Sequence, residues 1–127
     1  MIPVYQTMTV ANDGTGNCFN ACVASILELP LRDVCQVLPG KSDNYWGEWA
    51  DWLRTLGLKI DWQYEVPKGY SIATGYGGRF YPDGHDKAGD HILHAAVVFN
   101  GELAHDPFPC AKHFGDIKYY WVIDKLT

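Results

Sequence analysis

The dipeptide Asn100-Gly101 limits the possible folds of this chain more than any other feature. It separates an apolar run, His94 to Phe99, from a second short segment, Glu102 to Asp106. Asn-Gly favours the left-handed turn that joins two antiparallel strands. The two flanking segments are therefore predicted to pair as neighbouring strands of an antiparallel sheet.

Two registers of this hairpin are open. One pairs Phe99 with Glu102 through a two-residue type I′ loop and places His94 on the same side as His105. The other has a bulge at the turn, shifts the pairing by one residue and places His94 opposite Asp106. A contact between the imidazole and the carboxylate requires the second register or an equivalent bulge.

Before the hairpin the chain is helical first and then extended. Turn residues over 11–17 end in Asn17, a strong N-cap type, and an apolar helix is predicted over 18–29, stopped by Pro30. Helices are also predicted over 31–37 and 45–56, strands over 58–66, 70–75 and 119–123, and a long mobile loop over 77–89. This order predicts an α+β fold, with helices on one side of an antiparallel sheet and a single domain over 1–127.

Composition excludes several classes of function. The 127 residues are 47% hydrophobic and carry 15 acidic against 10 basic side chains, a net charge of −5 with no run of Lys or Arg. Electrostatic binding to nucleic acid or to an anionic membrane is therefore not expected. No apolar stretch approaches the roughly 20 residues of a membrane span.

The same reasoning bears on the compartment and on the cysteines. Residues 1–6 have neither a basic region nor an apolar signal core, so a cytoplasmic location is expected. In the cytoplasm the four cysteines are expected to be thiols, and each is then a candidate for chemistry. The oligomeric state is left open.

Cys18 is the strongest candidate because it begins a helix directly after a turn. The unpaired N–H groups and the dipole at a helix N-terminus stabilise a thiolate and lower its pKa. The same N–H groups can hold the oxyanion of a tetrahedral intermediate. The alternative is a small buried cysteine that happens to follow a cap.

A cysteine nucleophile needs a base, and the base usually needs a group to orient it. Of the five histidines, His94 opens the most apolar strand, and such a strand holds an imidazole rigidly. Asp106 ends the partner strand and would orient that imidazole if the hairpin register allows it.

These residues carry a resemblance to a known family. They are Gln6, the run CFNACVASIL from Cys18, the run HAAVV from His94, and Asp106-Pro107. Together they resemble a papain-like cysteine peptidase, most similar to the double-glycine, bacteriocin-processing branch and to small phage-encoded relatives. The resemblance implies a papain-like fold and a thiol hydrolase that acts on a peptide, isopeptide or side-chain amide bond of a peptide or protein substrate, without metal or cofactor.

The resemblance also implies roles for single residues. Cys18 would be the nucleophile, His94 the general base, Asp106 its orienting group and Gln6 the side chain of the oxyanion hole. Gln6 lies about twice as far from the cysteine as in the family, so it reaches the site only if residues 12–16 form a looped insertion; Asn17 is the alternative donor. The family usually has Gly immediately after the nucleophile, where this chain has another residue.

Two competing hypotheses stay open. The first is a catalytically idle binding module, such as a phage-encoded inhibitor of a host factor that acts in the host cytoplasm. The second is a zinc site built from Cys18, Cys22, His91 and His94, since two thiolates and two imidazoles suit tetrahedral zinc. Arg79, in a glycine-rich stretch, is expected at the rim of the cleft, near a substrate carboxylate or carbonyl.

Overall fold

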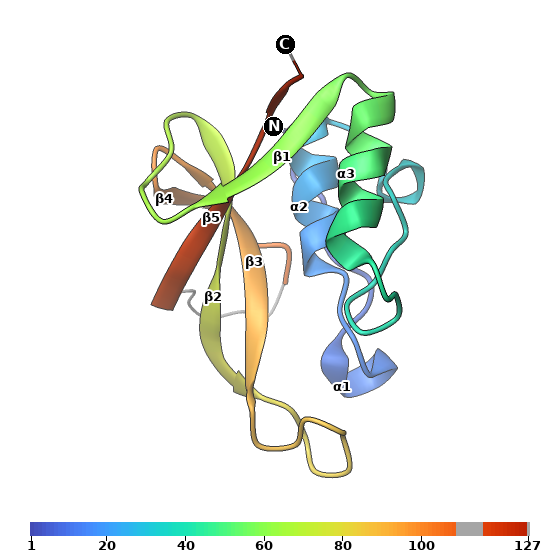
Figure 1. Ribbon diagram of the computed structural model, residues 1–127. Helices are drawn as coiled ribbons and strands as arrows, with labels where there is room; N and C mark the ends of the chain where they lie inside the picture. Colours follow the sequence, from blue (N-terminus) through green and yellow to red (C-terminus); the bar gives the residue numbers. More distant parts are fainter. Residues whose placement is uncertain (109–115, 127) are drawn as a thin grey trace.

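A computed structural model describes residues 1–108 and 116–126. Its first elements are helices (Figure 1). They are α1 (Val10–Asp13), α2 (Cys18–Leu27), a short 3-10 helix η1 (Leu31–Asp33) and α3 (Tyr45–Thr55). Within the described residues, no helix combines the length and the apolar character that crossing a membrane requires. Cys110 lies outside the described residues.

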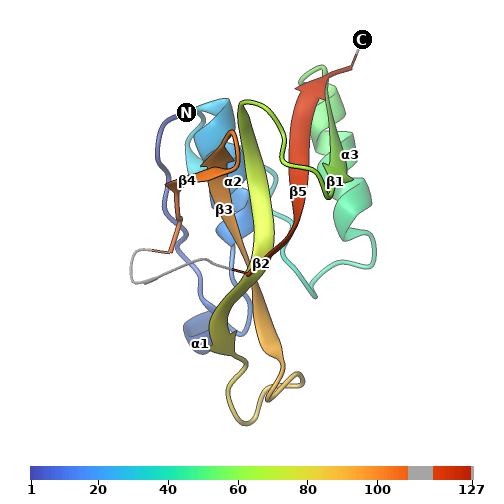
Figure 2. The same cartoon turned by 90° about the vertical axis from the view of Figure 1, so that its left-hand side faces the viewer.

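Within the described ranges, five antiparallel strands follow and form one open sheet. They are β1 (Leu58–Gln63), β2 (Tyr70–Phe80), β3 (His91–Phe99), β4 (Glu102–His105) and β5 (Asp116–Lys125), in the spatial order β1-β5-β2-β3-β4. Helices α2 and α3 lie on one face of the sheet (Figure 1), and a view of the opposite face shows the sheet in front of them (Figure 2). The predicted α+β arrangement is confirmed at this level of detail.

The turn between β3 and β4 adopts the first of the two registers. Asn100 and Gly101 have φ of 51° and 85°, both in the left-handed region that a type I′ turn requires. Phe99 accordingly pairs with Glu102. By itself this register would place Asp106 on the face of the hairpin opposite to that of His94.

A bulge further along β4 reverses that outcome. The pairing shifts by one residue before it reaches Val97 and His105, which makes Ala104 the extra residue. Because an extra residue inverts the alternation of side chains, Asp106 falls on the side of His94. His105 faces away, and its Nε2 lies 2.7 Å from the carbonyl oxygen of Val4. This is the equivalent bulge that contact between His94 and Asp106 requires.

The core lies between α2, α3 and the sheet. In α2, Ala21, Cys22, Val23 and Ala24 are fully buried, and their small size lets the helix lie close to β3. Trp49 of α3 is fully buried in the same cluster. Core packing therefore fixes the distance between the start of α2 and the sheet.

Some element boundaries differ from the predictions. Helix α2 ends at Leu27, because Glu28 takes a left-handed conformation with φ of 59°. The helix predicted over 31–37 is only the single turn η1, since the Asn20 amide donates to the carbonyls of Cys35 and Val37 and holds that segment outside a helix. The loop predicted over 77–89 is shorter, because β2 extends to Phe80.

Gly75 allows three strands to approach one another beside the site. It pairs with His94 on β3 and with Ile117 on β5, next to a shift in register. A Cβ atom at Gly75 would lie 2.0 Å from the backbone oxygen of Asp116. Only glycine fits there without movement of the β5 backbone.

Candidate active site

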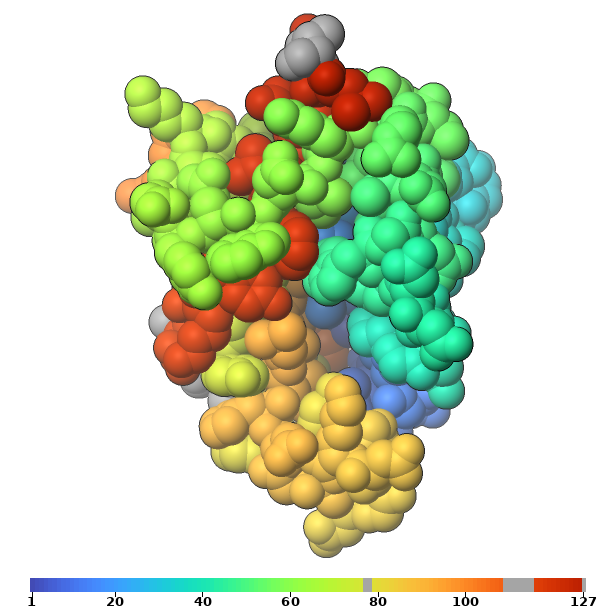
Figure 3. All heavy atoms as spheres, viewed as in Figure 1, coloured from blue at the N-terminus to red at the C-terminus, as the bar shows by residue number. Residues whose placement is uncertain are grey.

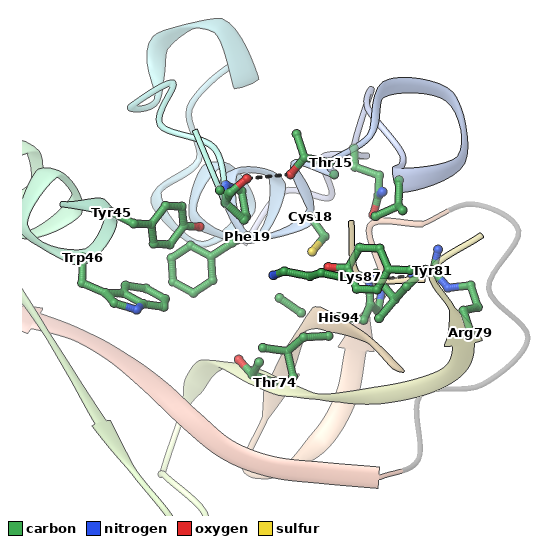
Figure 4. A pocket seen from close by; sticks show the side chains of 18 of the residues that line it. Thr15, Cys18, Phe19, Tyr45, Trp46, Thr74, Arg79, Tyr81, Lys87 and His94 are labelled. Atoms are coloured by element: carbon green, nitrogen blue, oxygen red, sulfur yellow. Dashed lines mark hydrogen bonds between the residues drawn. The ribbon is translucent and has the colours of Figure 1, made fainter. Parts of the chain in front are cut away.

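Cys18 is the first residue of α2 and lines a pocket between the helices and the sheet (Figure 4). Asn17 precedes it at the N-cap position, but its side chain makes no capping hydrogen bond. The N–H groups of the first turn therefore have no partner from Asn17, and they point toward the end of the helix where an anion is stabilised. The Cys18 residue is half-buried.

The Asn17 side chain instead anchors the N-terminal segment, residues 1–8. Its Oδ1 accepts hydrogen bonds from the backbone N–H groups of Thr7 and Met8, each at 3.0 Å. Its Nδ2 donates to the Thr7 hydroxyl at 2.9 Å. Asn17 is not among the described residues that line the pocket. Asn17 thus holds the predicted N-cap position, but its side chain bonds the N-terminal segment rather than the first turn of α2.

Gln6 lies in the pocket with Cys18. Helix α1 and the turn after it loop out of the path from residue 8 to residue 17, which brings Gly16 back beside the Gln6 amide. The Gln6 Nε2 donates to the Met8 carbonyl at 2.9 Å, while its buried Oε1 accepts no hydrogen bond from the described residues. The looped insertion needed for Gln6 to reach the site is therefore present.

His94 and Asp106 form the closest ionisable pair at the site. His94 Nε2 lies 2.7 Å from Asp106 Oδ1, which also accepts the Phe108 N–H at 3.0 Å. Their side chains are 3% and 15% exposed. Burial opposes ionisation of the carboxyl, but the hydrogen bonds from His94 and the Phe108 N–H outweigh it, and the pKa of Asp106 falls below its usual value.

The pKa of His94 moves in the opposite direction. Burial alone lowers it, but hydrogen bonds with Asp106 and Cys18 and the negative charges of both raise the pKa to about 9. Since Nε2 faces the carboxylate, the hydrogen bond with Cys18 falls to Nδ1, which also lies 3.2 Å from Arg79 Nη2. An imidazolium at neutral pH is the partner that a thiolate needs.

The pKa of Cys18 is lowered overall, although burial alone would raise it. A hydrogen bond with His94 and the imidazolium charge lower it, and so do a hydrogen bond with the Ala95 backbone and the charge of Arg79. Cys22, one turn along α2, lacks these partners, and burial raises its pKa well above the usual value. Of these two neighbouring thiols, only Cys18 has a lowered pKa.

The pocket has a volume of about 370 Å³. In Figure 3 the surface is hollowed between α3, in green and teal, and β3, in orange, above the tip of the β2–β3 hairpin. His85 at that tip lies 2.9 Å, through its Nε2, from the carbonyl oxygen of Gly14 after α1, so the tip is tied to the helical side. The described lining includes Gln6, Thr15, Cys18, Phe19, Tyr45, Trp46, Thr74, Arg79, Tyr81, Lys87, Ile92, His94 and Tyr119.

The alternative zinc site does not assemble. His91 is exposed on β3, where its ring lies against Tyr76 and Phe80. Among the described residues, no group of three or more His, Cys, Asp or Glu side chains is arranged to hold a metal ion. Cys22 is fully buried in the core, as a packing residue would be.

Sequence reasoning missed part of this site. No local signal in the sequence reveals how the elements around the pocket are arranged. Sequence reasoning therefore did not place Lys87, Tyr45, Trp46 or the Ala95 backbone contact at the site. Arg79 was expected at the rim, and it does line the pocket. Comparisons with protein-family models, with curated proteins and with solved structures give no match to this chain.

Proposed function

We propose that this protein is a papain-like thiol hydrolase of a peptide, isopeptide or side-chain amide bond. One observation carries the proposal: Cys18, His94 and Asp106 are linked by hydrogen bonds in that order, with the thiol at the start of α2. That order is the chemistry of a nucleophile, a base and an orienting group. The resemblance of the sequence to papain-like peptidases and the α+β arrangement support the same assignment.

In the first half of the reaction the Cys18 proton is on His94 Nδ1, and the thiolate attacks the carbonyl carbon of the amide. His94 then gives this proton to the leaving nitrogen, the C–N bond breaks, and a thioester on Cys18 is left. Asp106 holds the imidazole through Nε2 and stabilises its positive charge. In the second half water attacks the thioester, gives a proton to Nδ1 and releases the acid.

The negative charge on the carbonyl oxygen is held at the start of α2. The N–H groups of the first helical turn supply one set of donors, and Gln6 Nε2 supplies a second, since only one of its two hydrogens is used by Met8. Each such donor is worth about 2.7–4 kcal/mol in the transition state. The reaction uses only groups of the chain and water, so the proposal includes no cofactor.

The proposal is tested with 4-nitrophenyl acetate, an activated acyl donor too small to depend on substrate specificity. The expected result is a rapid burst of about one nitrophenolate per chain, with the acetyl group found on Cys18 by mass spectrometry. Cys18→Ala removes the burst. Cys35→Ala, which removes a half-buried thiol that does not line the pocket, retains it. An equal burst in Cys18→Ala, or none in the native chain, contradicts the proposal.

A binding module without catalysis is the second candidate, and one contact favours it. Arg79 Nη2 lies 3.2 Å from His94 Nδ1, the atom that must take the thiol proton. If that contact persisted, the base would stay occupied and the pocket would serve only for binding. The acylation experiment separates the two candidates, since an idle module gives no burst.

A further inference from the structure

The pocket beside Cys18 is positively charged in an acidic chain. The net charge is −5, yet the described residues that line the pocket include Arg79 and Lys87 and no Asp or Glu. The nearby Asp106 carboxylate is already bonded to His94 and to the Phe108 N–H. Asp106 and the Cys18 thiolate interact electrostatically with Arg79, but the described lining holds two side-chain cations and no carboxylate, a balance that favours an anionic ligand.

Neither cation has a carboxylate partner in the part of the chain that the structure describes. The ion pairs found there involve the N-terminus, Arg54, Lys59, Lys118 and His94. The Arg79 guanidinium lies 4.2 Å above the ring of Phe108, and the Lys87 ammonium lies 5.7 Å from the ring centre of Tyr81. Each cation thus lies near an aromatic face; Arg79 Nη2 also contacts His94 Nδ1, and the remaining N–H donors of both cations can meet a ligand.

The protonation of His94 decides where the Arg79 donors point. While Nδ1 is unprotonated it can accept from Arg79 at 3.2 Å. Once Nδ1 carries the proton of Cys18 it can no longer accept, and the two positive groups repel. In the reactive form of the site, this repulsion favours an Arg79 orientation whose donors face the pocket rather than the imidazole.

The proposed reaction fixes which part of the substrate meets Arg79. His94 must reach the leaving nitrogen to protonate it, so the leaving group lies against His94 and hence beside Arg79. Figure 4 shows the aromatic side chains Phe19, Tyr45 and Trp46 gathered on the opposite side of Cys18. Arg79 thus lies on the His94 side of the pocket and the aromatic rings on the other, while the Lys87 ammonium projects between Phe19 and Cys18.

We infer that the substrate carries a carboxylate on its leaving-group side, held by Arg79 with Lys87 as a second contact, and an apolar group on its acyl side. The inference rests on the proposed function. The carboxylate can be the C-terminus of a peptide or the side chain of an acidic residue next to the cleaved bond, and both present the same planar anion to the guanidinium fork.

Two alkylating reagents test the anion site without a known substrate. Iodoacetate and iodoacetamide both transfer a CH₂ group to a thiolate and release iodide, and they differ only in a carboxylate against an amide. The measured quantity is the rate of Cys18 alkylation by iodoacetate divided by the rate with iodoacetamide. This ratio is then divided by the same ratio for N-acetylcysteine. We expect a normalised ratio of about tenfold or more in favour of iodoacetate, which Arg79→Met abolishes and Lys87→Met reduces. Lys59→Met, a cation of β1 outside the pocket, leaves the ratio unchanged.

The two reagents keep this inference separate from the proposed function. A normalised ratio near one, with Cys18 still reacting with iodoacetamide as a low-pKa thiol, overturns the carboxylate inference alone. If Cys18 reacts with iodoacetamide no faster than an ordinary thiol, the proposed function falls and the inference with it. A high ratio that survives in Arg79→Met also overturns the assignment of the anion to that residue.

Protection against iodoacetamide identifies the source of the carboxylate. Glycylglycine is compared with glycylglycine amide, and the α-amide of glutamic acid with the α-amide of glutamine. The inference predicts that the charged member of one pair protects Cys18 at a concentration about tenfold lower than its neutral partner, and that Arg79→Met removes the difference. Equal protection within both pairs overturns it.

Discussion

Asp106→Asn is expected to lower kcat/KM for hydrolysis by about 10³–10⁴-fold, by analogy with other triads. The amide keeps the shape of the side chain and can still accept the Phe108 N–H, so the fold is retained. It removes the negative charge that lies 2.7 Å from His94 Nε2. The pKa of His94 then falls from about 9, and the thiolate–imidazolium pair, which supplies both the nucleophile and the acid, becomes scarce at neutral pH.

Two readouts separate this role from a structural one. Burst kinetics with 4-nitrophenyl acetate follow acylation, and an NMR titration follows the His94 imidazole directly. Asp61→Asn, which removes an exposed carboxylate of β1, is the matched control and should change neither. A variant with normal acylation and an unchanged His94 pKa would show that Asp106 does not act through the imidazole.

Trp49→Ala is expected to cost about 3–5 kcal/mol of the free energy of unfolding, within the range for large aromatic residues in a core. Trp49 is fully buried and its ring lies 5.2 Å from that of Phe19, the neighbour of Cys18. Since small domains are stable by only about 5–15 kcal/mol, the melting temperature should fall by about ten degrees or more.

An exposed tryptophan of the same chain serves as the control for Trp49→Ala. Trp62 on β1 is 54% exposed, so Trp62→Ala removes the same side chain from the surface. It should cost about 1 kcal/mol or less. Denaturant titration followed by circular dichroism measures both variants, and equal losses of stability would mean that Trp49 is not the core anchor of α3.

Local signals in the sequence predicted the parts of this fold that local physics determines. The type I′ turn at Asn100-Gly101 follows from the ease with which both residues take positive φ. The start of α2 at Cys18 follows from the turn residues before it. The strand order does not follow from such signals, because β5 inserts between β1 and β2 through contacts distant in the sequence.

Some members of the candidate site were predicted from the sequence, but its assembly was not. Nothing in the residues of β4 marks Ala104 as the extra residue of a bulge, yet that bulge brings Asp106 to His94. The loop containing α1 likewise decides whether Gln6 or Asn17 reaches the pocket, and it depends on tertiary hydrogen bonds. The extension of β2 that carries Arg79 to the site depends on pairing with β3.

The central claim is that Cys18 and His94 form a thiolate–imidazolium pair. The most direct measurement is the pH dependence of Cys18 alkylation by iodoacetamide, read by mass spectrometry in the native chain and in His94→Ala. In the native chain the rate should rise with pH through an apparent pKa well below the usual thiol value of about 8.5. In His94→Ala that pKa should rise above the usual value, because burial of the thiol persists while its largest stabilising partner is gone. An ordinary pKa in both proteins would contradict the account.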